Sequence, residues 1–175
     1  MNTHVTFLNH SCFIITSPSE RILCDPWFKG PAFGNGWSLL HENSHDIDEL
    51  QFDYIWISHE HPDHFSIPTL LGLKKKCTFL FQETKDKKVR QFLESKGHTV
   101  IELRHKEKVT IGDLELTCIV CDGYDSSLLV RYPDGKILLN INDARVELND
   151  HLQREIEPIL NGEPVDLLTF QFSYA

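Results

Sequence analysis

The chain has 175 residues, of which 41% are hydrophobic and 25% charged, and this balance excludes a wholly disordered protein. Its 26 acidic and 17 basic side chains give a formal net charge of −9, which disfavours nucleic acid as a partner because both surfaces would be negative. The length predicts one domain over residues 1–175. Ten histidines against one methionine indicate metal or proton chemistry.

Apolar runs of strand length, bounded by turn-forming residues, predict strands at Val5–Phe7, Cys12–Thr16, Arg21–Cys24, Tyr54–Ser58, Cys77–Phe81, His98–Leu103, Lys108–Ile111, Leu114–Cys121, Ser127–Tyr132, Ile137–Ile141 and Val165–Phe172. Helical periodicity predicts helices at Pro68–Lys75, Thr84–Lys96 and Asn149–Leu160, and a helical turn at Ile47–Leu50. Strands come first, then helices alternate with strands, and then strands return. This order fits an α+β, four-layer αββα sandwich, although composition alone does not separate it from an ordinary α/β sandwich.

No membrane segment or secretory signal is expected. Met1–Thr6 carries no charged leader, and no apolar stretch reaches the roughly 18 residues of a membrane span. The five cysteines are dispersed, so we expect a cytoplasmic protein with reduced thiols. Cys118 and Cys121 have C-x-x-C spacing, but residues three apart on a strand face opposite sides. We therefore interpret this pair as two small hydrophobic residues.

The loop Trp27–Asn43 combines glycine and proline with aromatic residues. Such a segment is either a lid or substrate wall, or a plain ordered loop. We name Trp37 as a candidate substrate-binding residue in this loop.

A cluster of histidines directly follows the apolar run Tyr54–Ser58: His59-Glu60-His61-Pro62-Asp63-His64. In an extended segment His59 and His61 share a face and can bind one ion. Pro62 bends the chain, so Asp63 and His64 can reach the same pocket from the other side. Imidazole and carboxylate ligands predict a divalent metal, zinc first, with manganese and iron(II) as alternatives. The competing interpretation is a solvated polar loop.

This string resembles the H-x-H-x-D-H signature of the metallo-β-lactamase superfamily. Phe7–Ile14 followed by Asp25-Pro26 is similar to the branch that contains ascorbate-6-phosphate lactonase and N-acylphosphatidylethanolamine-hydrolysing phospholipase D. Gly30-Pro31-Ala32-Phe33 with Trp37 resembles the metallo-β-lactamase-like part of hydroxylases of the CMP-N-acetylneuraminate type. The resemblance implies the αββα fold and is strongest over residues 5–65.

The resemblance also implies one or two divalent ions and a set of ligands from three parts of the chain: His59, His61, Asp63 and His64, then Asp122 and Asp125, then Asp143. The second part departs from the family, which usually has a histidine there, and an aspartate shifts the preference towards manganese or iron. The alternative for Asp122 and Asp125 is a simple turn around Gly123, and for Asp143 a turn or cap. The family's last histidine would follow the strand Val165–Phe172. The sequence ends at Ala175, before that histidine. We therefore expect a fold that is incomplete at the C-terminus, either because the sequence is truncated or because a partner chain or a homo-oligomer completes it.

The leading functional hypothesis is a metal-dependent hydrolase that cleaves an ester, lactone or phosphodiester bond of a small molecule with metal-activated water. Asp63 is the candidate catalytic residue, because it could orient that water and accept its proton. His10, in a predicted turn, is a second candidate substrate-binding residue. One alternative is a non-haem iron oxygenase component acting on a sugar or nucleotide-sugar, with its Rieske centre outside these residues, because no C-x-H…C-x-x-H pair is present. The other is a fold relic that binds a metal or ligand without turnover.

Overall fold

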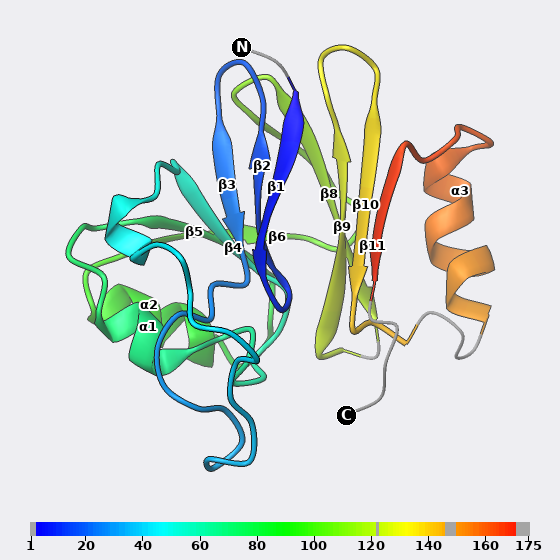
Figure 1. Cartoon of the computed structure of the whole chain (residues 1–175). Coiled ribbons are helices and arrows are strands. Elements are labelled where there is room, and N and C mark those ends of the chain that lie inside the picture. Colours follow the sequence, from blue (N-terminus) through cyan, green and yellow to red (C-terminus); the bar gives the residue numbers. More distant parts are fainter. Residues whose placement is uncertain (1–2, 122, 146–149, 171–175) are drawn as a thin grey trace. The chain divides into compact units, whose positions relative to one another are not determined.

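The computed structural model describes residues 3–121, 123–145 and 150–170, and the chain divides into two compact units, Met1–Glu102 and Leu103–Ala175 (Figure 1). Among the described residues, no helix is both long enough and apolar enough to cross a lipid bilayer.

The first unit is built on a six-stranded sheet whose strands lie side by side in chain order: β1 (His4–Asn9), β2 (Cys12–Thr16), β3 (Arg21–Cys24), β4 (Tyr54–Ile57), β5 (Thr78–Gln82) and β6 (Thr99–Leu103). Strand β2 is antiparallel to both β1 and β3, whereas β4 is parallel to β3 and to β5. The carboxyl ends of β3 and β4 therefore lie at one edge of the sheet. Because β2 runs opposite to β3, the turn between β1 and β2 lies at that edge too.

Helices α1 (Ile67–Leu71) and α2 (Lys88–Ser95) cover one face of this sheet, as Figure 1 shows. Residues two apart on a strand share a face, and this pattern supplies the core beneath the helices: Ile55 and Ile57 from β4, Phe79 and Phe81 from β5, with Leu70, Val89 and Leu93 from the helices. Burial of each such side chain contributes about 1.5–3 kcal/mol to the free energy of unfolding. A short 3₁₀ helix, η1 (Ile47–Glu49), buries Ile47 in the same core.

Both predicted helices of this unit are longer than the observed ones. Helix α1 ends at Leu71 and not at Lys75, because Gly72 follows and the Lys74 amide donates to Asp48 Oδ1 at 3.2 Å. Helix α2 begins at Lys88 and not at Thr84, because Lys87 has a left-handed backbone with φ of 55°. In both places a contact or a local conformation replaces the helical hydrogen bonds that the periodicity predicts.

The second unit contains a five-stranded sheet in the order β11 (Leu167–Phe170), β10 (Ile137–Asn142), β9 (Asp125–Arg131), β8 (Leu114–Cys121) and β7 (Lys108–Ile111). Strands β7 to β10 are antiparallel, and β11 is parallel to β10. The π-helical segment η3 (Leu152–Ile156) continues into α3 (Glu157–Leu160), and both pack against Ile119, Leu129 and Leu139. The described part of the predicted helix 149–160 is thus helical, while its first residue, Asn149, lies outside the described residues. The last two residues of the predicted strand 165–172 also lie outside them.

All five cysteines are buried, and none of them is joined in a disulfide. Cys121 belongs to the core cluster with Ile119, and Cys118 lies on the other face of β8, as the strand alternation predicts. Burial raises the pKa of the Cys118 thiol to about 12. Two thiols on opposite faces of a strand cannot bind one metal together, so the interpretation of this pair as small hydrophobic residues is supported.

Candidate metal centre

Three segments of the first unit meet at the edge where β3 and β4 end. They are the turn between β1 and β2, which carries His10; Asp25, directly after β3; and the loop Ser58–His64, directly after β4. The parallel pairing of β3 with β4 continues one residue past the end of β3, where the Asp25 amide donates to the carbonyl of Trp56 at 2.9 Å. The order of the strands therefore brings together residues that are far apart in the sequence.

Asp25 is fully buried and is hydrogen-bonded to the loop that carries the histidines. Its carboxylate accepts hydrogen bonds from the Ser58 amide at 2.8 Å, from the Ser58 hydroxyl at 2.8 Å and from His64 Nδ1 at 3.1 Å. Its backbone lies in the left-handed region, with φ of 41°, which few residues other than glycine adopt. A buried carboxylate is stable only when it is paired and hydrogen-bonded, and these three donors fulfil that condition.

The Asp25 carboxylate also fixes the tautomers of two histidines. An ionised carboxylate only accepts, so His64 carries a proton on Nδ1, and the Ser58 hydroxyl points its proton to Asp25. The Ser58 oxygen then accepts from His59 Nδ1 at 2.9 Å, which places a proton on that nitrogen as well. In both rings Nε2 is then the unprotonated nitrogen, which is the one that can bind a cation. A carboxylate behind the histidine is the usual arrangement in metal sites.

His59 and His61 converge on one side of this loop. Nε2 of His59 lies 2.8 Å from Nδ1 of His61, and the two ring centroids are 4.5 Å apart. The rings of His59 and His64 are 4.2 Å apart and tilted by 40°. His59 and His64 are buried, each with 1% exposure, whereas His61 is exposed. The structure thus brings these three predicted residues together, and the solvated-loop interpretation does not describe His59 or His64.

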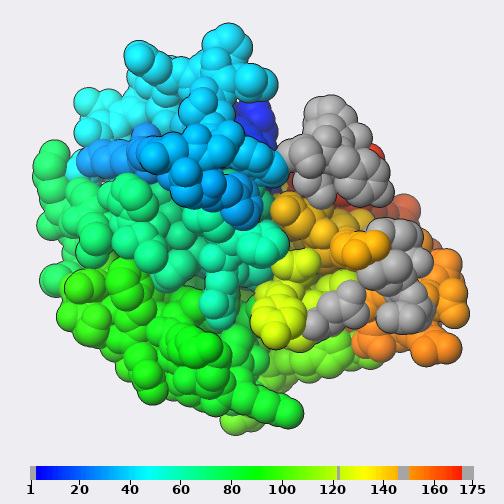
Figure 2. Space-filling model, turned by 90° about the horizontal axis from the view of Figure 1, so that it is seen from below, coloured from blue at the N-terminus to red at the C-terminus, as the bar shows by residue number. Residues whose placement is uncertain are grey.

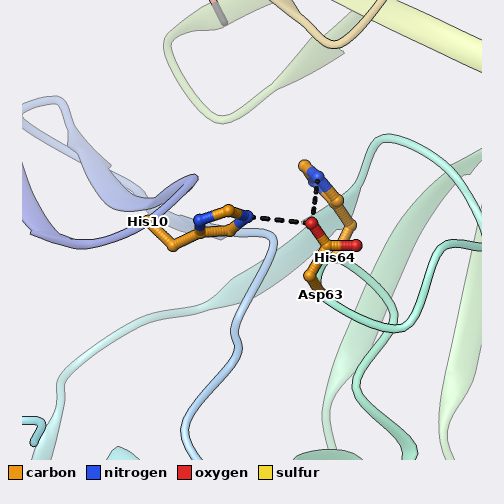
Figure 3. Close-up of side chains that lie close together, drawn as sticks. All are labelled: His10, Asp63 and His64. Atoms are coloured by element: carbon orange, nitrogen blue, oxygen red, sulfur yellow. Dashed lines mark hydrogen bonds and ion pairs between the residues drawn. The ribbon is translucent and has the colours of Figure 1, made fainter. Parts of the chain in front are cut away.

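Asp63 lies on the other side, between two imidazoles (Figure 3). Its Oδ2 is 2.9 Å from His10 Nε2 and 3.4 Å from His64 Nε2. Burial by itself raises the pKa of Asp63, but the hydrogen bond from His10 and the interaction with His64 outweigh it, so that the pKa lies well below its ordinary value. Asp63 is therefore an anion at neutral pH.

The residues present fit a divalent cation. A nitrogen of His64 and an oxygen of Asp63 lie within 4.8 Å of each other, and a nitrogen of His10 lies within the same distance of both. The other oxygen, Asp63 Oδ1, is buried and has no hydrogen-bond partner among the described residues. Ligands about 2.1 Å from one tetrahedral ion lie about 3.4 Å apart, which is the separation of His64 Nε2 and Asp63 Oδ2. Burying Asp63 Oδ1 without a partner costs free energy, and a bound cation would offset that cost.

The glycine-rich loop reaches the centre through Phe33. The ring of Phe33 lies 5.8 Å from that of His61 and 4.7 Å from that of Trp37. The backbone of Trp37 forms an isolated antiparallel β-bridge with Ala32, and its ring packs against that of Phe33. Phe33, more than Trp37, is therefore the aromatic side chain beside the histidines, and a role of Trp37 in substrate binding stays a prediction.

The remaining predicted ligands belong to the second unit. Asp125 is the first residue of β9 and pairs with Cys121 of β8 across a turn in which Gly123 has φ of 78°. Asp143 directly follows β10. Asp122 lies outside the described residues. The roles of these three aspartates as metal ligands stay predictions.

A hollow of about 580 Å³ lies elsewhere in the first unit, between residues 28–30 and 39–49. Figure 2 views the side on which this loop, coloured blue to cyan, is exposed. Its wall includes His41, Glu42 and His45, all exposed, and none of the histidines of the centre.

Sequence reasoning missed two supporting residues, Asp25 and Ser58. In the sequence, Asp25 stands out only as part of a resemblance, and Ser58 only as the last residue of a predicted strand. A weak signal was available, because both positions directly follow or end apolar strands, where parallel neighbours present polar groups at a common edge. The pairing that joins them is not visible in either local sequence.

The family follows from comparison with known proteins. The model of the beta-lactamase superfamily domain matches residues 4–131, so the chain belongs to this superfamily. A curated relative, cytidine monophosphate-N-acetylneuraminic acid hydroxylase of Danio rerio, is 32% identical over 171 residues, which is 90% of this chain and 28% of the relative. The chain thus spans little more than a quarter of that relative's length.

Solved structures give the same fold at low sequence identity. CmlA β-hydroxylase, in its E377D mutant, has a TM-score of 0.74 at 18% identity over 96% of this chain and 35% of that chain. An isothiocyanate hydrolase from gut bacteria of Delia radicum has a TM-score of 0.65 at 16% identity over 86% of this chain and 67% of that chain. The predicted metallo-β-lactamase-like αββα fold class is confirmed. Chains of this fold include one named as a hydroxylase and one named as a hydrolase, so the fold does not specify the reaction. The candidate ligand groups support binding of a divalent metal.

Proposed function

We propose that this chain is the metal-binding part of a non-haem iron hydroxylase that acts on a sugar or nucleotide-sugar. The observation that carries the proposal is the buried set of imidazoles with one carboxylate, braced by Asp25, in a chain similar over 90% of its length to a hydroxylase of a nucleotide-sugar. Two histidines and one carboxylate are the ligands typical of non-haem iron(II) oxygenases. A solved structure of similar fold is named a diiron β-hydroxylase from Streptomyces venezuelae, with a TM-score of 0.69.

The proposed ligands in the first unit are His59, His61, His64 and Asp63. That Asp143 and Asp122 or Asp125 complete the ligand set stays a prediction from the sequence. Iron, when bound, supplies the activation of dioxygen. Asp25 and Ser58 orient the rings of His59 and His64 so that Nε2 can bind the metal, and the ring of Phe33 lies beside that of His61. The electrons that hydroxylation requires come, in this proposal, from a separate Rieske centre outside these residues.

Metal-dependent hydrolysis is the second candidate, because a hydrolase shares the fold and Asp63 lies beside two imidazoles. In that reaction Asp63 would orient a water molecule and accept its proton. A general base works best when its pKa is near the working pH, and the pKa of Asp63 lies far below that range. This favours Asp63 as an ionised cation ligand over Asp63 as a proton acceptor.

The test compares metal content with reaction type. The protein is purified without chelator from medium that contains iron, zinc and manganese, and its metals are measured alongside those of the His61→Ala variant. The proposal predicts retained iron that this variant loses, and no hydrolysis of generic esters, lactones or phosphodiesters beyond that of the variant. Hydrolysis that depends on zinc or manganese and is lost with His61 would replace the proposal by the second candidate. A protein that binds none of the three metals would contradict both and leave a ligand-binding relic.

A further inference from the structure

His10 occupies a strained position next to the centre. It lies in the turn between β1 and β2, with φ of 37°, in a region that costs a residue with a β-carbon about 1 kcal/mol or more. Glycine would relieve that cost. A histidine in its place suggests that the side chain has a task that outweighs the strain.

Neighbouring residues fix the direction of this side chain. Asn9 donates from Nδ2 to the Trp27 carbonyl at 3.3 Å and contacts Asn43, which ties the turn to the loop after β3. The ring of Trp27, buried and hydrogen-bonded through Nε1 to the Gly30 carbonyl at 2.8 Å, meets the ring of His10 edge-on at 5.2 Å. The imidazole is therefore held between the turn and a core tryptophan.

From this position His10 meets the ring of His64 edge-on at 5.7 Å and makes a hydrogen bond to Asp63. Its Nε2 lies 2.9 Å from Asp63 Oδ2, and because that oxygen belongs to a carboxylate, the nitrogen is the donor (Figure 3). The bond fixes one oxygen of Asp63 and so the plane of the carboxylate. The second oxygen remains buried and has no hydrogen-bond partner among residues 3–121, 123–145 and 150–170.

We propose that His10 is a positioning residue: its Nε2–H holds Asp63 Oδ2 so that the carboxylate is oriented for the cation before the cation binds. The proposal rests on the proposed metal centre and assigns His10 a task different from substrate binding. Asp25 orients His64 on one side, and His10 orients Asp63 on the other, so that each buried ligand has its own supporting group. Removing such a supporting group lowers metal affinity by about 10–100-fold in proteins of known metal sites.

The experiment measures metal affinity of the whole chain by competition with a coloured chelator, using iron(II) without oxygen and zinc separately. His10→Ala removes the donor, whereas His10→Gln keeps an amide N–H at a similar reach, and both variants bear the same backbone strain. Circular dichroism and thermal unfolding of the metal-free proteins establish that they are folded. We expect His10→Ala to lose about 10–100-fold in affinity and His10→Gln to recover most of it.

X-ray absorption of the loaded proteins separates positioning from direct ligation. The proposal predicts the same number of imidazole nitrogens around the metal in the wild-type protein and in His10→Ala. An affinity of His10→Ala equal to that of the wild-type protein would overturn the proposal, as would the loss of one imidazole from the metal in that variant, since His10 would then be a ligand. Absence of metal binding by the wild-type protein would instead refute the proposed function, and this inference with it.

Discussion

Two segments of the first unit have closely similar compositions and different structures. Residues 41–46 read His-Glu-Asn-Ser-His-Asp, and residues 59–64 read His-Glu-His-Pro-Asp-His. In the first segment both histidines are exposed around an open hollow, and Asp46 accepts from the Asp48 amide as a helix cap. In the second, His59, Asp63 and His64 are buried, and each makes a hydrogen bond or ion pair with another side chain.

The difference lies in what precedes each segment. Residues 59–64 follow a buried parallel strand, β4, whose neighbour β3 supplies Asp25 at the same edge. Residues 41–46 follow an irregular loop and have no buried carboxylate of this kind among the described residues. The same residue types therefore form a candidate metal centre only where the sheet buries them and a second group orients them.

The largest expected effect comes from removing a proposed ligand in one segment and its counterpart in the other. His61→Ala should lower metal affinity by more than about 100-fold, because it removes a proposed ligand, and loss of a supporting group alone lowers affinity by about 10–100-fold. His61 is exposed, so we expect the variant to fold as the wild-type protein does. His41→Ala is the matched control and should bind metal as the wild-type protein does. Chelator competition measures both. Equal affinities in the two variants would remove the distinction between the segments.

The next largest effect concerns the group behind the histidines. Asp25→Asn should lower metal affinity by about 10–100-fold and the free energy of unfolding by about 1–3 kcal/mol, because buried donors lose a charged acceptor. Asp46→Asn is the control in the other segment, where asparagine caps a helix as well as aspartate. Denaturant unfolding of the metal-free proteins measures the stability. If Asp25→Asn and Asp46→Asn changed metal affinity and the free energy of unfolding equally little, Asp25 would not be needed to orient the histidines.

His98 is a buried histidine that is not a proposed ligand, so it tests whether burial alone leads to metal binding. His98 is 9% exposed and its Nδ1 accepts from the Cys77 amide at 3.2 Å. Burial, and then the charge of Lys76, lower its pKa below the ordinary value. A histidine with a lowered pKa contributes stability that is complete above pH about 6.5 and is lost as the pH falls towards its folded pKa. The pH dependence of unfolding should therefore flatten between pH 7 and 5 in His98→Gln, with unchanged metal affinity. An unaltered pH profile would contradict this assignment.

The smallest effect is expected at His45, which is exposed on the wall of the hollow. His45→Ala should change the free energy of unfolding by less than about 0.5 kcal/mol, as surface substitutions generally do. Its metal affinity should match that of the wild-type protein. A marked loss of metal in this variant would show that the exposed segment also binds a cation, and the comparison between the two segments would fail.

The sequence predicted most strands and the histidine cluster, because both depend on local patterns. The apolar run Tyr54–Ser58 and the spacing of His59 and His61 are readable within a few residues. Helix ends were less predictable, since Asp48 and not the helix receives the Lys74 amide. The roles of Asp25 and His10 were not predictable in this way. Asp25 is 33 positions from its partner Ser58, and His10 is 53 positions from Asp63, and only the pairing of the strands brings them together.

The central claim is that residues 59–64 bind a cation through imidazole nitrogens that are already oriented in the folded chain. X-ray absorption at the metal edge of protein loaded with one equivalent of zinc tests this most directly. The account predicts at least two imidazole nitrogens at about 2.0–2.1 Å from the metal, and fewer in His61→Ala. A spectrum with oxygen neighbours alone, unchanged by that substitution, would contradict it.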